Sequence, residues 1–491
     1  MHTLKNFIGG KWRDSTGKRV KDLNPADIND VVADAPSSTA AEAAEACVAA
    51  ARAYEGWRQT PAPVRGQILF KVQRRMEERR QELAEALTRE EGKTIAESRG
   101  EIQRAINVIE FFAGEARRIT GETILSELPN NFCYTLKQPI GPVAIITPWN
   151  FPVAIPIWKM APALVSGNTV VFKPASLTPL TASLIVEMFD ECGLPPGVLN
   201  LVFGGGREVG DTIVRHPAIL AVSFTGSNDV GIGLYSAAAA RGIKCQCEMG
   251  GKNPIVVLGD ADLDLAVEST VQGAFGSTGQ RCTATSRAVV VDAVANQFVE
   301  RLAARTASLV VGNGLNPSTH VGPSVDERQL ETVLSYVDTG KREGATLVRG
   351  GGRVRDEGLD RGYFVAPAIF DHVDANMRIA QEEIFGPVLS LIRVPDSASA
   401  LSVANSVRFG LSASVYTSDV ASMFKFVDRL DAGIIHVNSP TVGGEAHIPF
   451  GGMKATGVGL REMGRVAIDF YTELKVVYVD YTGGVRKTNL Y

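Results

Sequence analysis

Short apolar runs alternate with helical stretches through the middle of the chain. The runs lie at residues 143–147, 169–172, 198–202, 219–224 and 243–247, and helix-like segments fall between them at 153–166, 179–192, 207–215 and 229–241. Strand, helix, strand at this spacing predicts a parallel sheet with helices on its faces. The rhythm restarts after about residue 254, with candidate strands at 255–258, 288–291, 388–394, 412–416 and 434–437. We therefore expect an α/β fold with two sheet-based domains.

The pattern differs at the two ends of this region. Before it, Thr39-x-x-Glu42 is a capping box in front of an Ala-rich helix, and a later helical stripe of apolar residues ends at Gly92. Residues 132–137 alternate between the two faces of a strand and are flanked by polar residues, which favours a projecting hairpin. The tail at 474–480 alternates again. We expect it to pair with another strand, of this chain or of another subunit.

Composition narrows the function classes. The 491 residues carry 50 Lys+Arg and 54 Asp+Glu, a net charge of −4, which excludes a whole-chain basic footprint for nucleic acid and argues against an anionic membrane surface. No apolar stretch approaches the roughly 18 to 20 residues of a membrane span, and the first residues contain no apolar signal core. Six cysteines in this length show no disulfide pattern, which favours a reducing cytoplasm. Cys245-x-Cys247 is interpreted as a strand with both thiols inward, so no metal site is predicted.

Three loop segments are candidates for chemistry. Residues 147–152, Thr-Pro-Trp-Asn-Phe-Pro, follow a predicted buried strand, where ligands bind in parallel sheets; alternatively they form a rigid turn with Asn150 as a helix cap. Residues 224–227, Phe-Thr-Gly-Ser, open a helix whose N-terminus attracts phosphate, or are an ordinary strand-to-helix turn. Cys282 ends the polar, Gly-rich run 276–282 and is a candidate nucleophile, or else an incidental loop thiol.

A carboxylate is the fourth candidate for chemistry. Glu248 stands at a predicted strand end before a Gly-Gly turn, where it can act on a water as a base; the alternatives are a helix cap or a lysine partner. Glu248 and Cys282 are far apart in the sequence, so any meeting must be spatial.

Seven motifs in order resemble the aldehyde dehydrogenase superfamily over nearly the whole chain. They are Pro-Trp-Asn-Phe-Pro (148–152), Lys-Pro-Ala (173–175), Phe-Thr-Gly-Ser (224–227), Glu-Met-Gly-Gly-Lys (248–252), Gly-Gln-Arg-Cys (279–282), Glu-Glu-Ile-Phe-Gly-Pro (382–387) and Pro-Phe-Gly-Gly (449–452). The resemblance implies a Rossmann-like NAD(P)-binding domain, placed at 1–120 and 141–250, and a catalytic α/β domain at 251–440. It also implies a small β extension for homodimer or homotetramer formation, placed at 121–140 and 470–491.

The resemblance also assigns roles to residues. Cys282 is the expected nucleophile, Glu248 the general base, Asn150 the oxyanion-hole amide and Lys159 a partner in a proton relay. Lys173 is expected to hold the adenosine ribose, Ser227 the pyrophosphate and Glu383 the nicotinamide ribose, with Phe385 near the nicotinamide. The expected cofactor contacts are completed by Ile146, Trp149, Ser176, Gly206, Gly210, Phe224, Gly226 and Gly250.

The implied reaction is covalent. The thiolate attacks an aldehyde, hydride passes to NAD or NADP, and the resulting thioester is hydrolysed to a carboxylic acid. Members that prefer NAD often carry Glu after Lys-Pro-Ala; Ser176 at this place removes its repulsion of a 2′-phosphate, so we expect NADP to be tolerated, unless the change is a neutral one.

The expected substrate is a small acidic aldehyde. The sequence around the nucleophile is similar to members that oxidise 2-oxoglutarate semialdehyde, and also to types acting on glyceraldehyde 3-phosphate or aminoadipate semialdehyde; succinic semialdehyde is a further candidate. Arg281 is the expected carboxylate anchor, because arginine binds carboxylates bidentately; alternatively it braces its own loop. An otherwise apolar tunnel is expected from Phe151, Ile155, Trp158 and Phe450.

Three rival functions stay open. A CoA-acylating aldehyde dehydrogenase would not need Glu248 for hydrolysis. A catalytically silent, crystallin-like member would not need Cys282, Glu248 and Asn150. A cysteine hydrolase would need a histidine near Cys282, and none of the six histidines has a recognisable base context.

Overall fold

The first sheet is assembled from distant parts of the chain. The structure is a computed structural model that describes residues 1–485. Within them the sheet has the strand order β22-β12-β11-β8-β9-β10-β2-β3, and the pairs among β8 to β12 are parallel. The strands are β2 (Asn6–Ile8), β3 (Lys11–Arg13), β8 (Pro142–Ile146), β9 (Thr169–Lys173), β10 (Leu199–Leu201), β11 (Ala221–Thr225), β12 (Lys244–Glu248) and β22 (Gly457–Val458). The predicted middle strands are confirmed to within about two residues.

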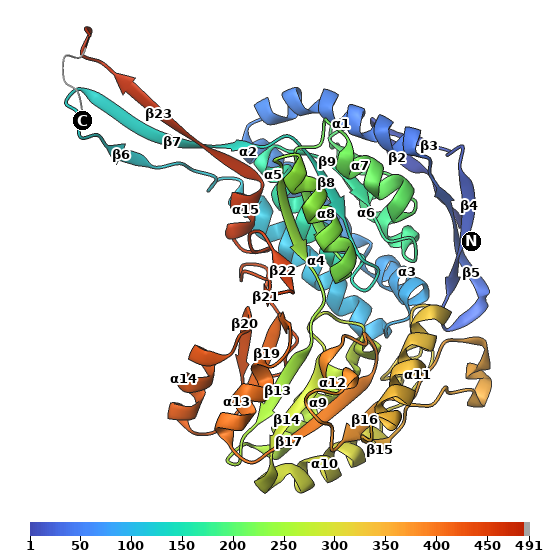
Figure 1. Ribbon diagram of the computed structural model, residues 1–491. Coiled ribbons are helices and arrows are strands. Elements are labelled where there is room, and N and C mark those ends of the chain that lie inside the picture. The colour runs from blue at the N-terminus through green and yellow to red at the C-terminus, as the bar shows by residue number, and fades with distance from the viewer. Residues whose placement is uncertain (486–491) are drawn as a thin grey trace.

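Helices cover both faces of this sheet (Figure 1). Val143 and Ile145 of β8 belong to one core cluster, with residues of α4, α5 and α6, whereas Ala144 and Ile146 belong to another, with residues of α1, α7 and α8. This alternation is the period-two geometry of a strand buried on both faces. The helices are α1 (Ala40–Gln59), α4 (Ile95–Glu115), α5 (Ala154–Ser166), α6 (Pro179–Glu191), α7 (Asp211–Arg215) and α8 (Asn228–Ala240).

The N-terminal helices begin and end where their capping residues stand. Thr39 and Glu42 form the expected capping box of α1, and Thr94 and Glu97 form a second one at α4. Gly92 ends α3 (Arg80–Glu91) with a left-handed φ of 98°, as expected; α2 (Ala62–Glu78) precedes α3. Three strands before residue 38, which the sequence pattern did not predict, form a separate sheet: β1 (His2–Thr3), β4 (Lys18–Asn24) and β5 (Asp27–Ser37).

A second sheet forms the core of the other body (Figure 1). Its order within residues 1–485 is β15-β16-β17-β14-β13-β19-β20. These strands are β13 (Asn253–Val257), β14 (Thr285–Val291), β15 (Thr346–Arg349), β16 (Ala368–Asp371), β17 (Val388–Val394), β19 (Ser412–Tyr416) and β20 (Ile434–Val437). The helices around it are α9 (Leu263–Phe275), α10 (Asp292–Ala307), α11 (Glu327–Arg342), α12 (Arg378–Gln381), α13 (Ser397–Asn405) and α14 (Val420–Arg429). The second α/β unit is therefore confirmed, with β15 and β16 added to it.

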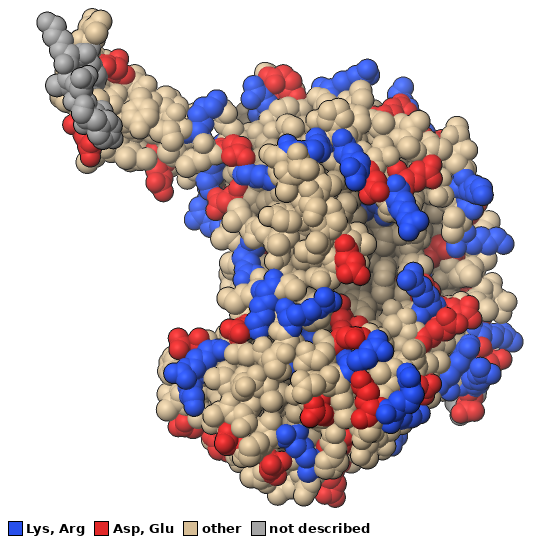
Figure 2. Space-filling view, in the orientation of Figure 1, with Lys and Arg blue, Asp and Glu red and all other residues tan. Residues whose placement is uncertain are grey.

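A three-stranded arm projects from the first body (Figure 1). It consists of β6 (Thr123–Leu125), β7 (Asn131–Pro139) and β23 (Thr472–Asp480), and β23 pairs antiparallel with β7 along its whole length. The tail thus finds its partner within its own chain. Uncharged surface prevails along the arm in Figure 2, and the side chains of Leu125 and Tyr478 are 96% and 70% exposed.

The predicted domain boundaries stay an interpretation. The chain does not remain in the second body after residue 440, because β22 pairs with β12 and α15 (Val466–Phe470) packs on α5. Residues 486–491 of the predicted oligomerisation strands lie outside the described residues. Among the helices of residues 1–485, none is long and apolar enough to cross a membrane.

Candidate active site

The carboxyl ends of β8, β11 and β12 bring three of the predicted segments together. β11 lies between β8 and β12, and all three run parallel, so the loop after Ile146, the turn after Thr225 and Glu248 reach the same edge of the sheet. A cavity of about 600 Å³ opens there. Its walls include Ile146, Trp149, Lys173, Gly206, Gly210, Phe224, Gly226 and Ser227, which are eight of the predicted cofactor residues.

This cavity fits a dinucleotide. Ser227 precedes α8, and its side chain makes no capping hydrogen bond within the described residues, so the first N–H groups of the helix are available to a phosphate. Burial lowers the pKa of Lys173 to about 8, and its Nζ donates to the carbonyl of Pro174 at 2.9 Å. A Cβ atom at Gly206 would meet nothing within 4 Å. Ser176, another predicted cofactor residue, does not line this cavity, and its Oγ donates to the Gly204 carbonyl oxygen at 3.4 Å.

A smaller cavity of about 230 Å³ continues from the first toward Cys282. It is lined by Trp149, Asn150, Ile155, Gly226, Ser227, Gly250, Cys282, Glu383 and Phe385, among others. Cys282 is partly exposed, whereas four of the other five cysteines are buried. Burial, Glu383 and Glu248 raise the pKa of the Cys282 thiol to about 12, which Arg104 opposes. The thiol is therefore protonated at neutral pH in this structure, and reaction requires a base.

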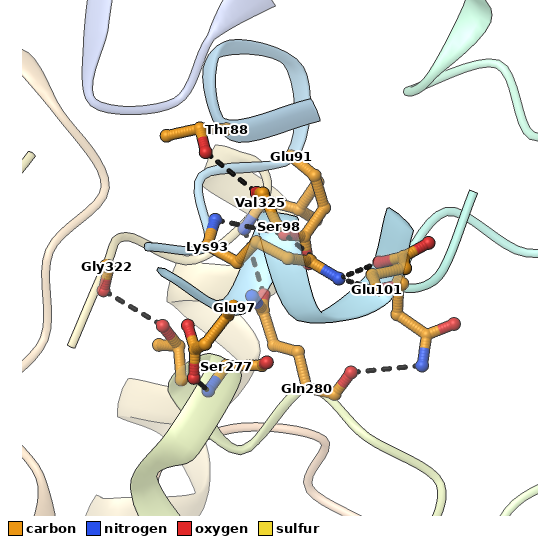
Figure 3. A network of polar contacts seen from close by, with 12 residues as sticks. Thr88, Glu91, Lys93, Glu97, Ser98, Glu101, Ser277, Gln280, Gly322 and Val325 are labelled. Atoms are coloured by element: carbon orange, nitrogen blue, oxygen red, sulfur yellow. Dashed lines mark hydrogen bonds and ion pairs between the residues drawn. The ribbon is translucent and has the colours of Figure 1, made fainter. Parts of the chain in front are cut away.

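The turn before the nucleophile is strained and held from outside (Figure 3). Ser277 and Thr278 have φ values of 47° and 57°, a left-handed region that costs energy for residues with a side chain. Glu97 accepts from the Ser277 N–H, and the Thr278 hydroxyl donates to the carbonyl of Gly322 at 3.0 Å. These contacts fix the backbone that leads to Cys282.

Asn150 lies in a buried polar network that joins α4 to the loop after β8. Its side-chain Nδ2 donates to the Gln280 carbonyl at 3.0 Å, which occupies one of its two N–H groups. Lys93 donates to the Asn150 carbonyl at 2.6 Å. It also donates to Glu101 at 2.6 Å (Figure 3). Glu101 in turn accepts from the backbone N–H groups of Val153 and Ala154 at the start of α5. Sequence reasoning missed this network, because Lys93 and Asn150 are 57 residues apart.

Glu248 and Lys159 are both buried and close enough to influence each other. The pKa of Glu248 is raised well above its usual range by burial and by Glu462, while Lys159 opposes the rise. Lys159 donates to Ser223 at 3.0 Å and forms an ion pair with Glu462. Glu462, which the sequence pattern did not single out, also accepts from the Trp158 indole N–H at 2.8 Å. A relay that joins Lys159 to Glu248 stays a prediction, and Glu462 is a second carboxylate that acts on both groups.

Glu383 and Phe385 enter the site from the second body. Glu383 accepts from the Gly251 N–H at 2.9 Å, and a Cβ at Gly250 would come within 2.0 Å of its carboxylate. Only glycine permits this approach. Burial raises the pKa of Glu383 to about 7. The rings of Phe385 and Trp149 meet edge to face, with centroids 5.3 Å apart.

Of the predicted tunnel residues within residues 1–485, Ile155 alone lines the 230 Å³ cavity, and Arg281 does not line it. Ile155, Trp158 and Phe450 belong to one core cluster, against which Phe151 and Cys282 pack, and the rings of Trp158 and Phe450 are 5.5 Å apart. Arg281 instead donates to Ser277 Oγ at 2.8 Å and pairs with Glu97 at 3.2 Å, which corresponds to the alternative in which it braces the loop. Its role as a carboxylate anchor stays a prediction.

Comparisons with known proteins agree with this geometry. A model of the "Aldehyde dehydrogenase family" matches residues 12–477. The chain is 48% identical over 479 residues to alpha-ketoglutaric semialdehyde dehydrogenase of Bacillus subtilis, covering 97% of this chain and 98% of the relative. It is 46% identical to alpha-ketoglutarate semialdehyde dehydrogenase of Haloferax volcanii, covering 97% and 99%. The crystal structure of betaine aldehyde dehydrogenase from Staphylococcus aureus in complex with NAD+ superposes with a TM-score of 0.96 at 34% identity, covering 98% of this chain and 96% of that one. The chain therefore belongs to the aldehyde dehydrogenase family.

Proposed function

We propose that this enzyme oxidises 2-oxoglutarate semialdehyde to 2-oxoglutarate with NAD or NADP. The observation that carries the proposal is that Cys282 and Asn150 line one cavity, which continues into the 600 Å³ cavity that fits a dinucleotide. The relatives at 48% and 46% identity are named for alpha-ketoglutarate semialdehyde, the same compound, and this supports the choice of substrate.

The side chains divide the reaction between them. Cys282 Sγ bonds to the aldehyde carbon after its proton has been removed, and the second N–H of Asn150 is available to the oxygen that becomes negative. Bound NAD(P) supplies the hydride acceptor. Glu248 then takes a proton from the water that attacks the Cys282 thioester, and the acid is released with the thiol restored.

A panel of aldehydes tests the substrate. We expect kcat/KM for 2-oxoglutarate semialdehyde to exceed that for the neutral pentanal by at least about tenfold, because a charge-assisted hydrogen bond is worth about 1.5 to 3 kcal/mol. Succinic semialdehyde, aminoadipate semialdehyde and glyceraldehyde 3-phosphate complete the panel, with each of NAD and NADP, and with and without CoA. A higher kcat/KM for pentanal would reject the proposal. An acyl-CoA product would establish the acylating alternative.

Lys93 provides a test of how the oxyanion amide is held. Lys93→Met removes the donor that fixes the Asn150 carbonyl, so we expect kcat to fall by about tenfold or more. The loss should not exceed the roughly hundred- to thousandfold cost of removing an oxyanion donor itself. NAD(P) affinity should stay near that of wild type, and Lys93→Arg should restore part of kcat. The exposed Lys71→Met is the matched control, and melting temperatures identify any loss of folding. An unchanged kcat with a lower melting temperature would assign Lys93 a purely structural role.

We also propose a homodimer or homotetramer in the cytoplasm. The exposed apolar side chains of the arm support assembly, since Leu474 and Val476 add to Leu125 and Tyr478 on its surface. All six cysteines are free, which agrees with a reducing compartment. Size-exclusion chromatography with light scattering tests the assembly.

A further inference from the structure

Two cysteines of β12 lie side by side, next to the predicted general base. Cys245 and Cys247 are separated by one residue, so the alternation of a strand puts both side chains on the same face of β12. Their Sγ atoms are 3.6 Å apart and share a hydrogen bond. Among residues 1–485 no other two thiols lie within hydrogen-bonding distance of each other, and all six cysteines are free. The two sulfur atoms therefore need no distant segment to meet.

The two thiols differ in their access to a small oxidant. Cys245 is 9% exposed and lies beyond the end of β22, which pairs with Cys247 and Glu248 only. Cys247 is fully buried. The hydrogen bond from Cys247, which burial opposes, lowers the pKa of Cys245, and Lys159 adds to this effect. Because the thiolate is the form that reacts with an oxidant, Cys245 is the attacking thiol and Cys247 the one that follows.

A metal ion is a poorer occupant of this pair. Structural zinc is held by four protein ligands and catalytic zinc by three and a water. Within the part of the chain that the structure describes, no group of three or more His, Cys, Asp or Glu side chains is placed to hold a metal ion. The pair therefore offers two electrons for oxidation rather than a coordination site.

A bond between the two sulfur atoms changes the strand that ends at Glu248. Cα atoms two positions apart in a strand are separated by about 6.6 Å, close to the upper limit of about 6.8 Å for a disulfide, so β12 contracts when the bond forms. The Cys247 thiol also gives up its contact with the Gly231 carbonyl of α8, at 3.6 Å. Glu248 is the next residue, and its carboxylate accepts from the Gly452 N–H at 3.3 Å. The contraction therefore changes how Glu248 lies against the loop that holds it.

We propose that Cys245 and Cys247 are a reversible redox switch, a disulfide that forms with a peroxide and slows hydrolysis of the Cys282 thioester. The Cys245 thiolate attacks one oxygen of hydrogen peroxide, which gives a sulfenic acid and hydroxide; the hydroxide takes up the proton that Cys245 has lost. Cys247 then attacks the sulfur of the sulfenic acid and releases water. In total two thiols and one peroxide give one disulfide and two waters, and the two electrons lost by sulfur reduce the peroxide.

Formation of the disulfide is tested by peptide mapping, which does not depend on the proposed function. The tryptic peptide 245–252 carries both thiols, and Cys282 falls in a different peptide. After treatment with hydrogen peroxide, this peptide should be lighter by two hydrogen atoms in the wild type, and dithiothreitol should reverse the change. Cys282→Ala should behave in the same way, and so should Cys192→Ala, the matched control. A peptide 245–252 that stays reduced, or that gains oxygen instead, at peroxide concentrations that oxidise Cys282 would overturn the inference.

The effect of the disulfide is tested by steady-state turnover after the same treatment. Wild-type turnover should fall about ten- to a hundredfold more than that of Cys247→Ala, and dithiothreitol should restore it, because a misplaced base costs activity on this scale. Oxidation of Cys282 affects both enzymes alike, so the difference between them reports the pair. Cys245→Ala is a second variant that cannot form the bond, and melting temperatures identify any loss of folding.

An equal loss in the wild type and in both variants would overturn the switch, even where the disulfide forms. This effect rests on the proposed role of Glu248 as the base. Failure of that role has its own signature, since Glu248→Gln would then keep its turnover without any peroxide.

Discussion

Replacing Cys282 by alanine is expected to abolish aldehyde oxidation, with a loss of more than about a thousandfold in kcat. The side chain supplies the bond on which the reaction depends, and no other cysteine lines the 230 Å³ cavity. NAD(P) affinity, measured by fluorescence titration, should not change, because Cys282 does not line the 600 Å³ cavity that fits the dinucleotide.

Cys192→Ala is the matched control for this variant. Cys192 is the other partly exposed cysteine, and it stands at the end of α6 away from the cavity. Its replacement should leave turnover intact. Activity of Cys282→Ala within tenfold of wild type would remove Cys282 from the chemistry.

Glu248→Gln is expected to separate acylation from hydrolysis. A glutamine cannot take a proton from water, so one burst of reduced cofactor should appear per active site, followed by turnover at least about a hundredfold slower. Rapid-mixing absorbance of the reduced cofactor measures both phases. A slowed burst would add deprotonation of Cys282 to the role of Glu248, and undiminished steady-state turnover would exclude both roles.

The pH profile gives a second measurement on the same variant. Burial and Glu462 raise the pKa of Glu248, so a rise in pH favours the carboxylate form that acts as a base. Steady-state turnover of the wild type should therefore increase with pH, and Glu248→Gln should lose this increase.

The sequence predicted those parts of the fold that follow from local periodicity. Strands such as β8 (Pro142–Ile146) are continuous apolar runs and could be located directly, and the capping box at Thr39 defined where α1 begins. β4 could not be found in this way, because most of its seven side chains are exposed and its sequence, Lys-Arg-Val-Lys-Asp-Leu-Asn, has little alternation. Its strand character comes from pairing with β5.

The residues of the candidate site fall into the same two groups, those found from the local sequence and those found only in the folded structure. Motifs identified Cys282, Glu248 and Asn150, since each stands in a distinctive local sequence. The groups that position them come from distant segments: Glu462 reaches Lys159 across 303 residues, and Lys93 reaches Asn150 across 57.

The pairing of β7 with β23 has a consequence for synthesis of the protein. β7 ends at Pro139, but its partner strand is complete only at Asp480. At roughly 5 to 20 residues per second, a ribosome needs about 17 to 70 seconds to add the residues between these two points. During this time Phe132 and Leu136 stand on a strand edge without their partner, which is the kind of edge that joins other chains. Glu462 is also synthesised late, so Trp158 and Lys159 lack their carboxylate partner for most of this time. Until its last residues are made, the nascent chain therefore exposes a strand edge that the folded enzyme covers.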